Sequence, residues 1–325
     1  MTLVVHRLLK LLLPFTWACA LLGAALPATA GAKLLVGISD QSAGVFSQPK
    51  LLSINVTTAR YILPWNAAVE RNKHDLNNAR AWINAAVAAG VEPMMSFDGN
   101  GNYIPTVGQY KAAISKFMKD FPKVRTYAAW NEPDWVYRPA LAHNPGLAAA
   151  YFNALHQACP RCTDVAGEVY LPTNYAPGSR WTLATYLRAY TRGLHYRPSA
   201  WALHNYYDVR THTTGQLRVM QSLTSGPIWL TEIAGIERRG HWQYRNQSVL
   251  AAAKDETFLF SLPTRFHRVT RIYHYDWFGS NAGANTGWDS GLVGPQGAPR
   301  PAYWVVAKAA GSRLGRTKRR SVRRR

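Results

Sequence analysis

Residues 125–132 read Arg-Thr-Tyr-Ala-Ala-Trp-Asn-Glu, a short β-rich run that ends in a glutamate. Similar runs recur along the chain from residue 33 onward, with stretches of helical periodicity between them. In order, the eight runs are Leu34 to Asp40, Ala59 to Asn66, Glu92 to Asn100, Arg125 to Glu132, Asp164 to Leu171, Ala200 to Tyr207, Ile228 to Ala234 and Arg271 to Phe278. Strands that alternate with helices in this way are typical of a parallel sheet built from βα units.

The segments between the runs carry apolar residues on one helical face. Between the second and third runs, Asp75 is placed to cap a helix and Gly90 is placed to end it. The apolar face of this helix is formed by Leu76, Ala79, Ile83, Ala86 and Val87. The next segment has a similar face, formed by Tyr110, Ile114, Phe117, Met118 and Phe121. We expect both faces to pack in the core.

Eight strands, each followed by enough residues for a helix, favour a closed (β/α)8 TIM barrel over an open doubly wound sheet. An open sheet of that kind usually has a glycine-rich phosphate turn after its first strand, and Gly37-Ile38-Ser39-Asp40 offers none. The chain has 325 residues, 47% of them hydrophobic, and no Pro/Ser-rich linker. We therefore expect an α/β fold with one barrel domain over residues 31–312.

Two of the predicted strands end in a glutamate. The fourth continues into Asn131-Glu132-Pro133-Asp134, and the seventh contains Thr231-Glu232-Ile233. Catalytic groups of such barrels lie at the carboxyl ends of the strands, so both side chains should reach one mouth. A carboxylate beside an apolar strand is costly to ionise, and two that converge indicate acid/base chemistry. Taken singly, each glutamate could instead anchor a loop.

The tripeptide Asn131-Glu132-Pro133 after strand four and Glu232 after strand seven resemble the signature of the clan A retaining glycoside hydrolases, the group that contains families 5 and 39. The stretch is also similar to family 128 endo-β-1,3-glucanases and to fungal Asl1-like hydrolases. The resemblance spans residues 33 to 312 or so. It implies an enzyme that cleaves β-linked sugars, with Glu132 as acid/base and Glu232 as nucleophile.

The same resemblance assigns further residues to the site. Arg60 on strand two is similar to the clan's arginine near the nucleophile, and His204-Asn205-Tyr206 is similar to its His-x-Tyr, whose tyrosine bonds the nucleophile. Trp277 on strand eight matches the aromatic platform beneath the sugar. Each has a structural alternative, because Arg60 could pair with another acid and His204 or Trp277 could be core residues.

These roles are chemically consistent. A retaining mechanism needs one protonated carboxyl to protonate the leaving oxygen and one ionised carboxylate to attack the anomeric carbon. Arg60 and Tyr206 would favour the ionised form of Glu232, and Asn131 is placed to bond the sugar 2-hydroxyl. Retention predicts that the two carboxyls lie roughly 5 to 5.5 Å apart.

Aromatic residues make up 12% of the chain, and sugar faces stack on such rings. Several lie near strand exits, namely Trp65, Tyr103, Trp135, Tyr170, Tyr206, Tyr207 and Trp277. We expect Trp65 and Trp277 to contact the substrate, although many aromatics must be core.

Two other functions remain open. A metal-dependent barrel hydrolase usually has a His-x-His pair on strand one, whereas here the strand ends Ile38-Ser39-Asp40 and leaves only His204, His274 and Asp276. We therefore expect no metal and no cofactor. The second alternative is a catalytically silent barrel that binds cell-wall or matrix glycan, which loss of either glutamate would have favoured.

Both termini differ from the barrel in composition. Residues 1–30 have Arg7 and Lys10, an apolar run from Leu11 to Leu26 and Ala28-Thr29-Ala30, the order of a secretory signal that is cleaved after Ala30. Such export predicts an extracellular protein. A membrane anchor is the alternative, but it needs about 20 uninterrupted apolar residues.

The mature chain would keep only Cys159 and Cys162, which we expect to form a local disulfide in an oxidising compartment.

Residues 313–325 hold eight of the basic residues behind the net charge of +21, without an acid. Such a run is typical of a disordered tail. For an exported monomer we expect an anionic cell-wall or membrane surface as its partner rather than nucleic acid, and a β-linked glycan as the substrate.

Overall fold

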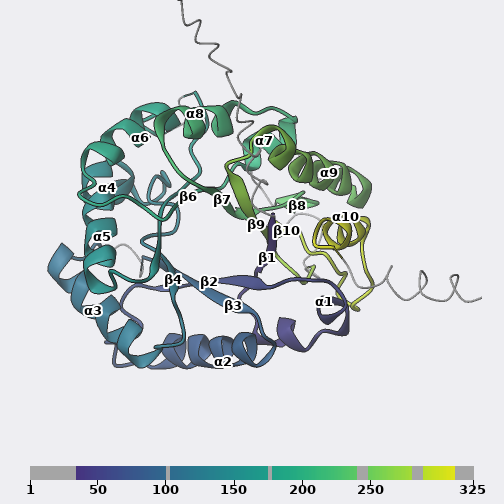
Figure 1. Ribbon diagram of the computed structural model, residues 1–325, viewed down its shortest axis with the longest axis horizontal. Coiled ribbons are helices and arrows are strands. Elements are labelled where there is room, and N and C mark those ends of the chain that lie inside the picture. The colour runs from purple at the N-terminus through teal and green to yellow at the C-terminus, as the bar shows by residue number, and fades with distance from the viewer. Residues whose placement is uncertain (1–33, 100–102, 175–177, 240–247, 280–287, 312–325) are drawn as a thin grey trace, which may run out of the picture. The chain divides into compact units, whose positions relative to one another are not determined.

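The structure is a computed structural model of the chain, and it describes residues 34–99, 103–174, 178–239, 248–279 and 288–311. These residues belong to one compact unit that begins at Ala32. Eight parallel strands close into a barrel, and helices surround it (Figure 1). The predicted (β/α)8 fold is confirmed, whereas the expected signal and basic tail lie outside the described residues.

The barrel strands follow the order of the chain. They are β1 (Leu35–Ser39), β2 (Thr58–Pro64), β3 (Glu92–Asp98), β4 (Thr126–Ala128), β5 (Thr163–Val169), β6 (Ala200–Leu203), β7 (Ile228–Ile233) and β9 (Val269–Tyr275). Strand β9 closes the ring by pairing with both β1 and β7. Several predicted runs extend beyond these strands at the carboxyl end, because residues 129–132, 204–207 and 276–278 lie outside the sheet.

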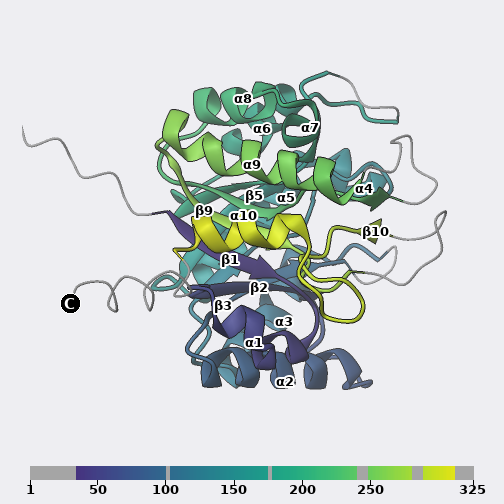
Figure 2. The same ribbon diagram turned by 90° about the vertical axis from the view of Figure 1, so that its right-hand side faces the viewer.

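Helices follow most of the strands and form the outer layer. They are η1 (Ala43–Ser47), α1 (Pro49–Leu52), α2 (His74–Ala88), α3 (Val107–Asp120), α4 (Pro139–Ala142), α5 (Pro145–Ala158), α6 (Leu183–Arg192), α7 (Tyr206–Thr211), α8 (Gly215–Leu223), α9 (Val249–Arg265) and α10 (Pro301–Ala309). A small antiparallel sheet of β8 (Arg238–Arg239) and β10 (Trp288–Asp289) was not predicted. In the side view, β1 points toward the end of the barrel where α4 and β10 lie (Figure 2).

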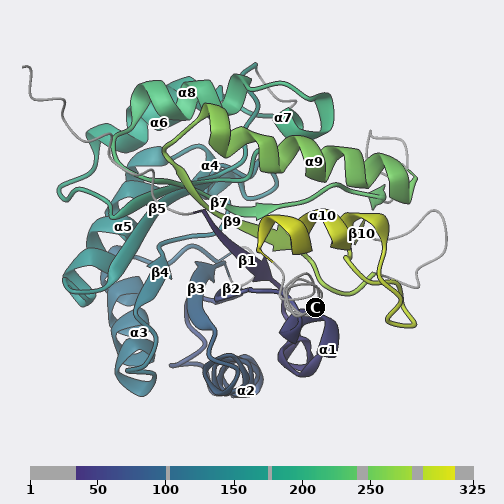
Figure 3. The same cartoon turned by 45° about the vertical axis from the view of Figure 1, so that its right-hand side comes forward.

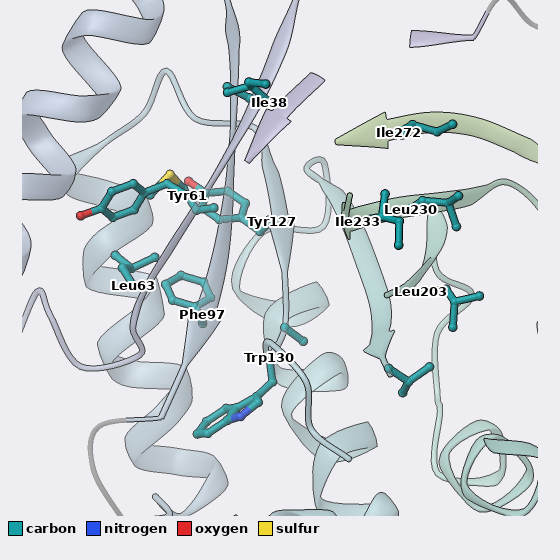
Figure 4. Packing of buried hydrophobic residues seen from close by; sticks show 14 of the residues in the cluster. Ile38, Tyr61, Leu63, Phe97, Tyr127, Trp130, Leu203, Leu230, Ile233 and Ile272 are labelled. Carbon is teal, nitrogen blue, oxygen red and sulfur yellow. The ribbon is translucent and has the colours of Figure 1, made fainter. Parts of the chain in front are cut away.

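Apolar side chains fill the layer between the strands and the helices. Leu76, Ala79, Ile83 and Ala86 of α2 are buried as predicted, and Val87 is half-buried. Figure 4 shows part of this layer, where Tyr61 and Phe97 lie on the outer side of their strands. The predicted cap of α2 is wrong, because Lys73 rather than Asp75 is its N-cap. The predicted end of the helix is confirmed, because Gly90 follows it with a φ of 73°.

The inside of the barrel changes character along its axis. Seven buried side chains form the lower layer, namely Met94, Ala128, Val165, Ala200, Ala202, Trp229 and Tyr273. Gly37 makes room for them, since a Cβ atom there would lie 2.6 Å from the Tyr273 ring. Beyond Gly37, Thr58 and Met94, the next inward position toward the carboxyl end of each strand is polar. These positions on β1, β2 and β3 are the buried Ser39, Arg60 and Ser96. A polar layer therefore rests on an apolar floor at the carboxyl ends of the strands, where the alternation of side chains places it.

Two further features concern the outside of the barrel. Cys159 and Cys162 form a disulfide with a Cα–Cα distance of 5.4 Å between α5 and β5, as predicted. Helix α5 lies beside β5, at the left of Figure 3. None of the helices in the described ranges has the length and apolar character that crossing a membrane requires.

Candidate active site

Glu132 stands at the exit of β4 on a tight turn. The backbone N–H of Asn131 donates to the carbonyl of Phe97 at 2.7 Å, and that of Glu132 donates to the carbonyl of Glu168 at 3.2 Å. Glu132 itself has a φ of 44°, a left-handed conformation that costs energy for a residue with a side chain. Downstream, Asp134 is buried and accepts the backbone N–H groups of Tyr170 and Leu171. The turn is thus tied to both neighbouring strands, and the Glu132 side chain is 19% exposed.

Glu232 lies on β7 and is held by two donors. Arg60 donates through Nη1 to Oε2 of Glu232 at 2.8 Å, and the hydroxyl of Tyr206 donates to Oε1 at 3.3 Å. Both donors stabilise a carboxylate rather than a neutral carboxyl group. The Glu232 side chain is 13% exposed, so it faces the mouth of the barrel.

The two glutamates face each other at close range. One oxygen of Glu132, one oxygen of Glu232 and one ring nitrogen of His204 all lie within 4.8 Å of one another. Their donors differ, since Glu132 has a histidine as its neighbour and Glu232 has an arginine and a tyrosine. The sequence prediction that both side chains converge on one mouth is confirmed by this geometry.

Arg60 is completely buried and connects the polar layer. Its Nε donates to Glu168 and to Ser96, both at 2.8 Å, and its Nη2 donates to Oδ1 of Asn131 at 2.7 Å. Burial would lower the pKa of Arg60, but the charges of Glu168 and Glu232 raise it above its ordinary value. The guanidinium therefore stays charged, and it contacts Glu232 and Asn131 rather than the solvent.

His204 is also buried and uses both ring nitrogens. Nδ1 lies 3.0 Å from Oε1 of Glu132, and Nε2 lies 3.1 Å from the Thr231 hydroxyl and 3.9 Å from Glu168. Burial would lower the pKa of His204, but the contacts with Glu132 and Glu168 and the charge of Glu232 outweigh it and raise the pKa to about 9. A protonated His204 donates to Glu132, so the histidine acts on the glutamate and does not itself reach a substrate.

Glu168 is a third carboxyl group of the site, and sequence reasoning missed it. Side chains alternate along β5, so the inward Val165 places Glu168 on the outer face of an undistorted strand. The register shifts between Gly167 and Val169, and Glu168 turns inward with a φ of 53°. Gly167, with a φ of 92°, was the available signal, because a glycine inside a strand often marks a bulge.

Two aromatic predictions are wrong. Trp277 is completely buried and packs edge-on against Tyr303 of α10, so its ring cannot serve as a platform for a sugar. The chain leaves β9 after Tyr275, and Tyr275 rather than Trp277 lines the mouth. Trp65 is 6% exposed and stacks against Tyr103, whose ring is 53% exposed. Trp65 therefore presents almost no surface to a substrate, whereas the neighbouring Tyr103 is exposed.

A cavity of about 480 Å³ opens at the carboxyl ends of β1 and β9. It is lined by Asp40, Gln41, Ser42, Tyr275, Asp276 and Phe278. Burial raises the pKa of Asp276 to about 7, and the charge of Asp40 acts in the same direction. Burial likewise raises the pKa of Asp40, although backbone N–H groups oppose the shift. The cavity therefore offers several groups that can bond hydroxyls.

Glu132, His204 and Glu232 are also the groups whose spacing could hold a cation. Their surroundings do not fit one, because the Arg60 guanidinium lies 2.8 Å from Glu232 and would repel a metal ion. The two other residues that the sequence offered for a metal are not part of this cluster. His274 pairs with Glu256 at 2.9 Å, and Asp276 lines the cavity at β1 and β9. The chemistry that the cluster fits is proton transfer and attack by a carboxylate.

Several solved structures share this fold. The chain superposes on a family 39 glycoside hydrolase from Bacteroides cellulosilyticus WH2 with a TM-score of 0.57 and 16% identity, covering 86% of this chain but only 64% of that one. A family 5 (subfamily 18) enzyme from Streptomyces cattleya, solved with GlcNAc, gives a TM-score of 0.62 and 12% identity over 86% and 80% of the two chains. An endo-β-1,4-glucanase from Xanthomonas axonopodis pv. citri gives 0.57 and 12% over 85% and 99%.

Sequence comparison identifies the class. No curated protein matches the sequence, but residues 72–305 match the family model described as the glycosyl hydrolase catalytic core. With the barrel and the paired glutamates, this match makes the protein a glycoside hydrolase and confirms the resemblance to clan A. The chain belongs to the glycosyl hydrolase catalytic core family.

Proposed function

We propose that the protein is a retaining β-glycosidase that acts by double displacement, with Glu132 as acid/base and Glu232 as nucleophile. The observation that carries this proposal is the approach of the two carboxyls to within 4.8 Å. Retaining enzymes hold their carboxyls about 5 to 5.5 Å apart, whereas inverting enzymes need about 6.5 to 9.5 Å to accommodate a water between carboxyl and sugar. The short separation leaves room for direct attack by a carboxylate.

In the first step an oxygen of Glu232 attacks the anomeric carbon while Glu132 gives its proton to the leaving glycosidic oxygen. The bond from this carbon to the leaving group breaks, and a glycosyl ester on Glu232 forms. In the second step Glu132 takes a proton from water, the water oxygen attacks the same carbon, and Glu232 is released as a carboxylate. Arg60 and Tyr206 bind Glu232 in that ionised form and orient it for attack.

His204 and Asn131 support these steps. Once Glu132 has lost its proton, a protonated His204 can donate Nδ1–H to the new carboxylate at 3.0 Å. Asn131 accepts from Arg60 through Oδ1, which leaves its side-chain N–H groups without a partner among the described residues. Those N–H groups can bond the sugar 2-hydroxyl, a contact that strengthens in the transition state.

The cavity at β1 and β9 favours a neutral sugar. Asp40 and Asp276 lie in its wall, and their carboxyls can bond hydroxyl groups. A uronic acid would bring a negative charge to the same place, and the raised pKa values of Asp40 and Asp276 indicate that this wall disfavours negative charge. We infer that the substrate is a neutral β-linked polysaccharide or oligosaccharide.

Export and surface attachment are proposed from the termini, which lie outside the described residues. Residues 1–30 have the composition of a secretory signal, and amino-terminal sequencing of the exported protein should begin at Gly31. The Cys159–Cys162 disulfide suits an oxidising compartment. The basic residues 313–325 would attach the enzyme to an anionic cell-wall or membrane surface.

Replacement of the two glutamates tests the mechanism. Glu232→Gln should lower turnover at least about a thousandfold, because an amide cannot attack the anomeric carbon. Glu132→Gln should cost about 10²- to 10⁴-fold on natural glycans and much less for formation of the glycosyl-enzyme from an activated aryl glycoside. In Glu132→Gln, added azide should speed the release of the sugar from the glycosyl-enzyme and yield a β-glycosyl azide. Wild-type rates in both variants would exclude the mechanism, and tight glycan binding without turnover in the wild type would favour a silent barrel.

A substrate panel tests the preference for neutral sugars. The purified protein should release sugar from at least one of β-glucan, xylan, mannan and galactan. Release from polymannuronate, a β-linked uronate, should be at least about tenfold slower, because its carboxylates meet a wall in which burial already disfavours negative charge. Asp276→Asn should narrow that difference at pH values above about 7, where Asp276 is ionised. Faster cleavage of the uronate by the wild type would show that the assignment of a neutral substrate is wrong.

Truncation after Gly311 tests the role of the tail. Loss of its positive charge should weaken binding to vesicles or wall preparations that carry negative charge, most strongly at low salt. Hydrolysis of a soluble neutral substrate should stay the same, because the site uses none of these residues. Equal binding by the full-length and truncated proteins at low salt would remove the proposed attachment.

A further inference from the structure

Glu168 has no part in the two chemical steps, yet the backbone is distorted to bring it into the site. The bulge at Gly167 turns the side chain of Glu168 to the inside of the barrel. Among the described residues, only Glu132, Glu168 and His212 have a positive φ without being glycine. Two of these three are thus site glutamates, and bulges beside active sites commonly redirect a side chain.

The contacts of Glu168 connect it to both catalytic groups through one intermediate each. Its Oε1 accepts from Arg60 Nε at 2.8 Å and from the Ser96 hydroxyl at 3.0 Å. Arg60 in turn donates to Glu232. The same oxygen lies 3.9 Å from Nε2 of His204, whose other nitrogen contacts Glu132. Oε2 of Glu168 is buried and has no hydrogen-bond partner among the described residues.

We propose that Glu168 is a positioning residue whose buried negative charge neutralises Arg60 and keeps the acid proton on the Glu132–His204 pair at working pH. The inference rests on the proposed function, since it assigns Glu132 the proton that the leaving group receives. Glu168 would not touch the substrate, because its side chain is completely buried.

The charges around Glu168 support this role. The titratable groups that face it come from five elements and are Arg60 of β2, Glu132 after β4, Tyr190 of α6, His204 after β6 and Glu232 of β7. Without Glu168, the positive charge of Arg60 would be balanced by Glu232 alone. The positive charge of Arg60 would then bind Glu232 more tightly, and it would make it easier for Glu132 to lose its proton.

The protonation of Glu168 is consistent with a fixed charge. Burial would raise its pKa, but the charge of Arg60 and the contacts with His204 outweigh this effect and lower the pKa to about 2. Glu168 therefore stays ionised throughout the pH range in which a glycosidase works. It supplies a constant field and does not exchange the catalytic proton itself.

The test is Glu168→Gln, which keeps the shape of the side chain and removes its charge. Both limbs of the pH profile of kcat/KM should move to lower pH by at least about one unit, because a negative charge has left the surroundings of both catalytic groups. Ser96→Ala is the matched control, since it removes a neutral partner of the same oxygen. Ser96→Ala should leave both limbs of the pH profile in place, whatever its effect on the rate. Glu168→Asp keeps the charge and should also leave them in place.

A purely structural role predicts a different result. In that case Glu168→Gln lowers the rate equally at every pH, or Ser96→Ala moves the limbs as far as Glu168→Gln does. Either result would overturn the proposal. Thermal unfolding followed by circular dichroism should accompany each variant, so that loss of the folded state is recognised.

Nitrogen NMR of the His204 ring gives a readout that needs no substrate, and its first measurement uses the wild-type protein alone. In the wild type His204 should titrate well above the ordinary histidine value of about 6.5, and in Glu168→Gln it should titrate at least about one pH unit lower than in the wild type. A wild-type His204 that titrates at or below the ordinary value contradicts the proposal. If no glycan is cleaved but His204 titrates as expected, the proposed function fails while the charge assigned to Glu168 stands.

Discussion

A fully buried arginine organises the mouth of this barrel. A guanidinium that is removed from water needs negative charge and hydrogen-bond acceptors around it, and breaking such a buried pair typically costs about 3 to 5 kcal/mol. Arg60 obtains both from Glu168, Glu232 and Asn131, which belong to three different parts of the chain. The neutralisation of one cation thus draws together Glu232, Glu168 and the residue beside Glu132.

The apolar floor beneath this layer serves the same chemistry. Packed side chains such as Met94 and Tyr273 fill the lower barrel and exclude water from the underside of the polar layer. Charges above such a floor interact more strongly than they would in water. The carboxyls of Glu232 and Glu132 nevertheless remain partly exposed, as the proposed attack on a substrate requires. The solved barrels share this fold at an identity of only 12% to 16%.

Much of the fold and the convergence of the two glutamates could be predicted from the sequence. Eight β-rich runs and apolar helix faces define the barrel, and the position of Glu132 and Glu232 in the strand count brings them to one mouth. Glu168 could not be predicted, because a period of two places it outside and only the bulge turns it inward. Trp277 was misplaced for a related reason, since the predicted strand continued to Phe278 whereas β9 ends at Tyr275. The alternation of residues in the sequence therefore could not predict local backbone irregularities such as these.

The central claim is that Glu232 attacks the sugar directly and that Glu132 and Glu232 act in two displacements. The most direct measurement is proton NMR of the product from the wild-type enzyme, recorded on a cleaved β-glycan before mutarotation. Two inversions at one carbon predict that the first product is the β-anomer, as in the substrate. An α-anomer at the earliest time points would mean a single displacement by water, and it would contradict the mechanism proposed for this site.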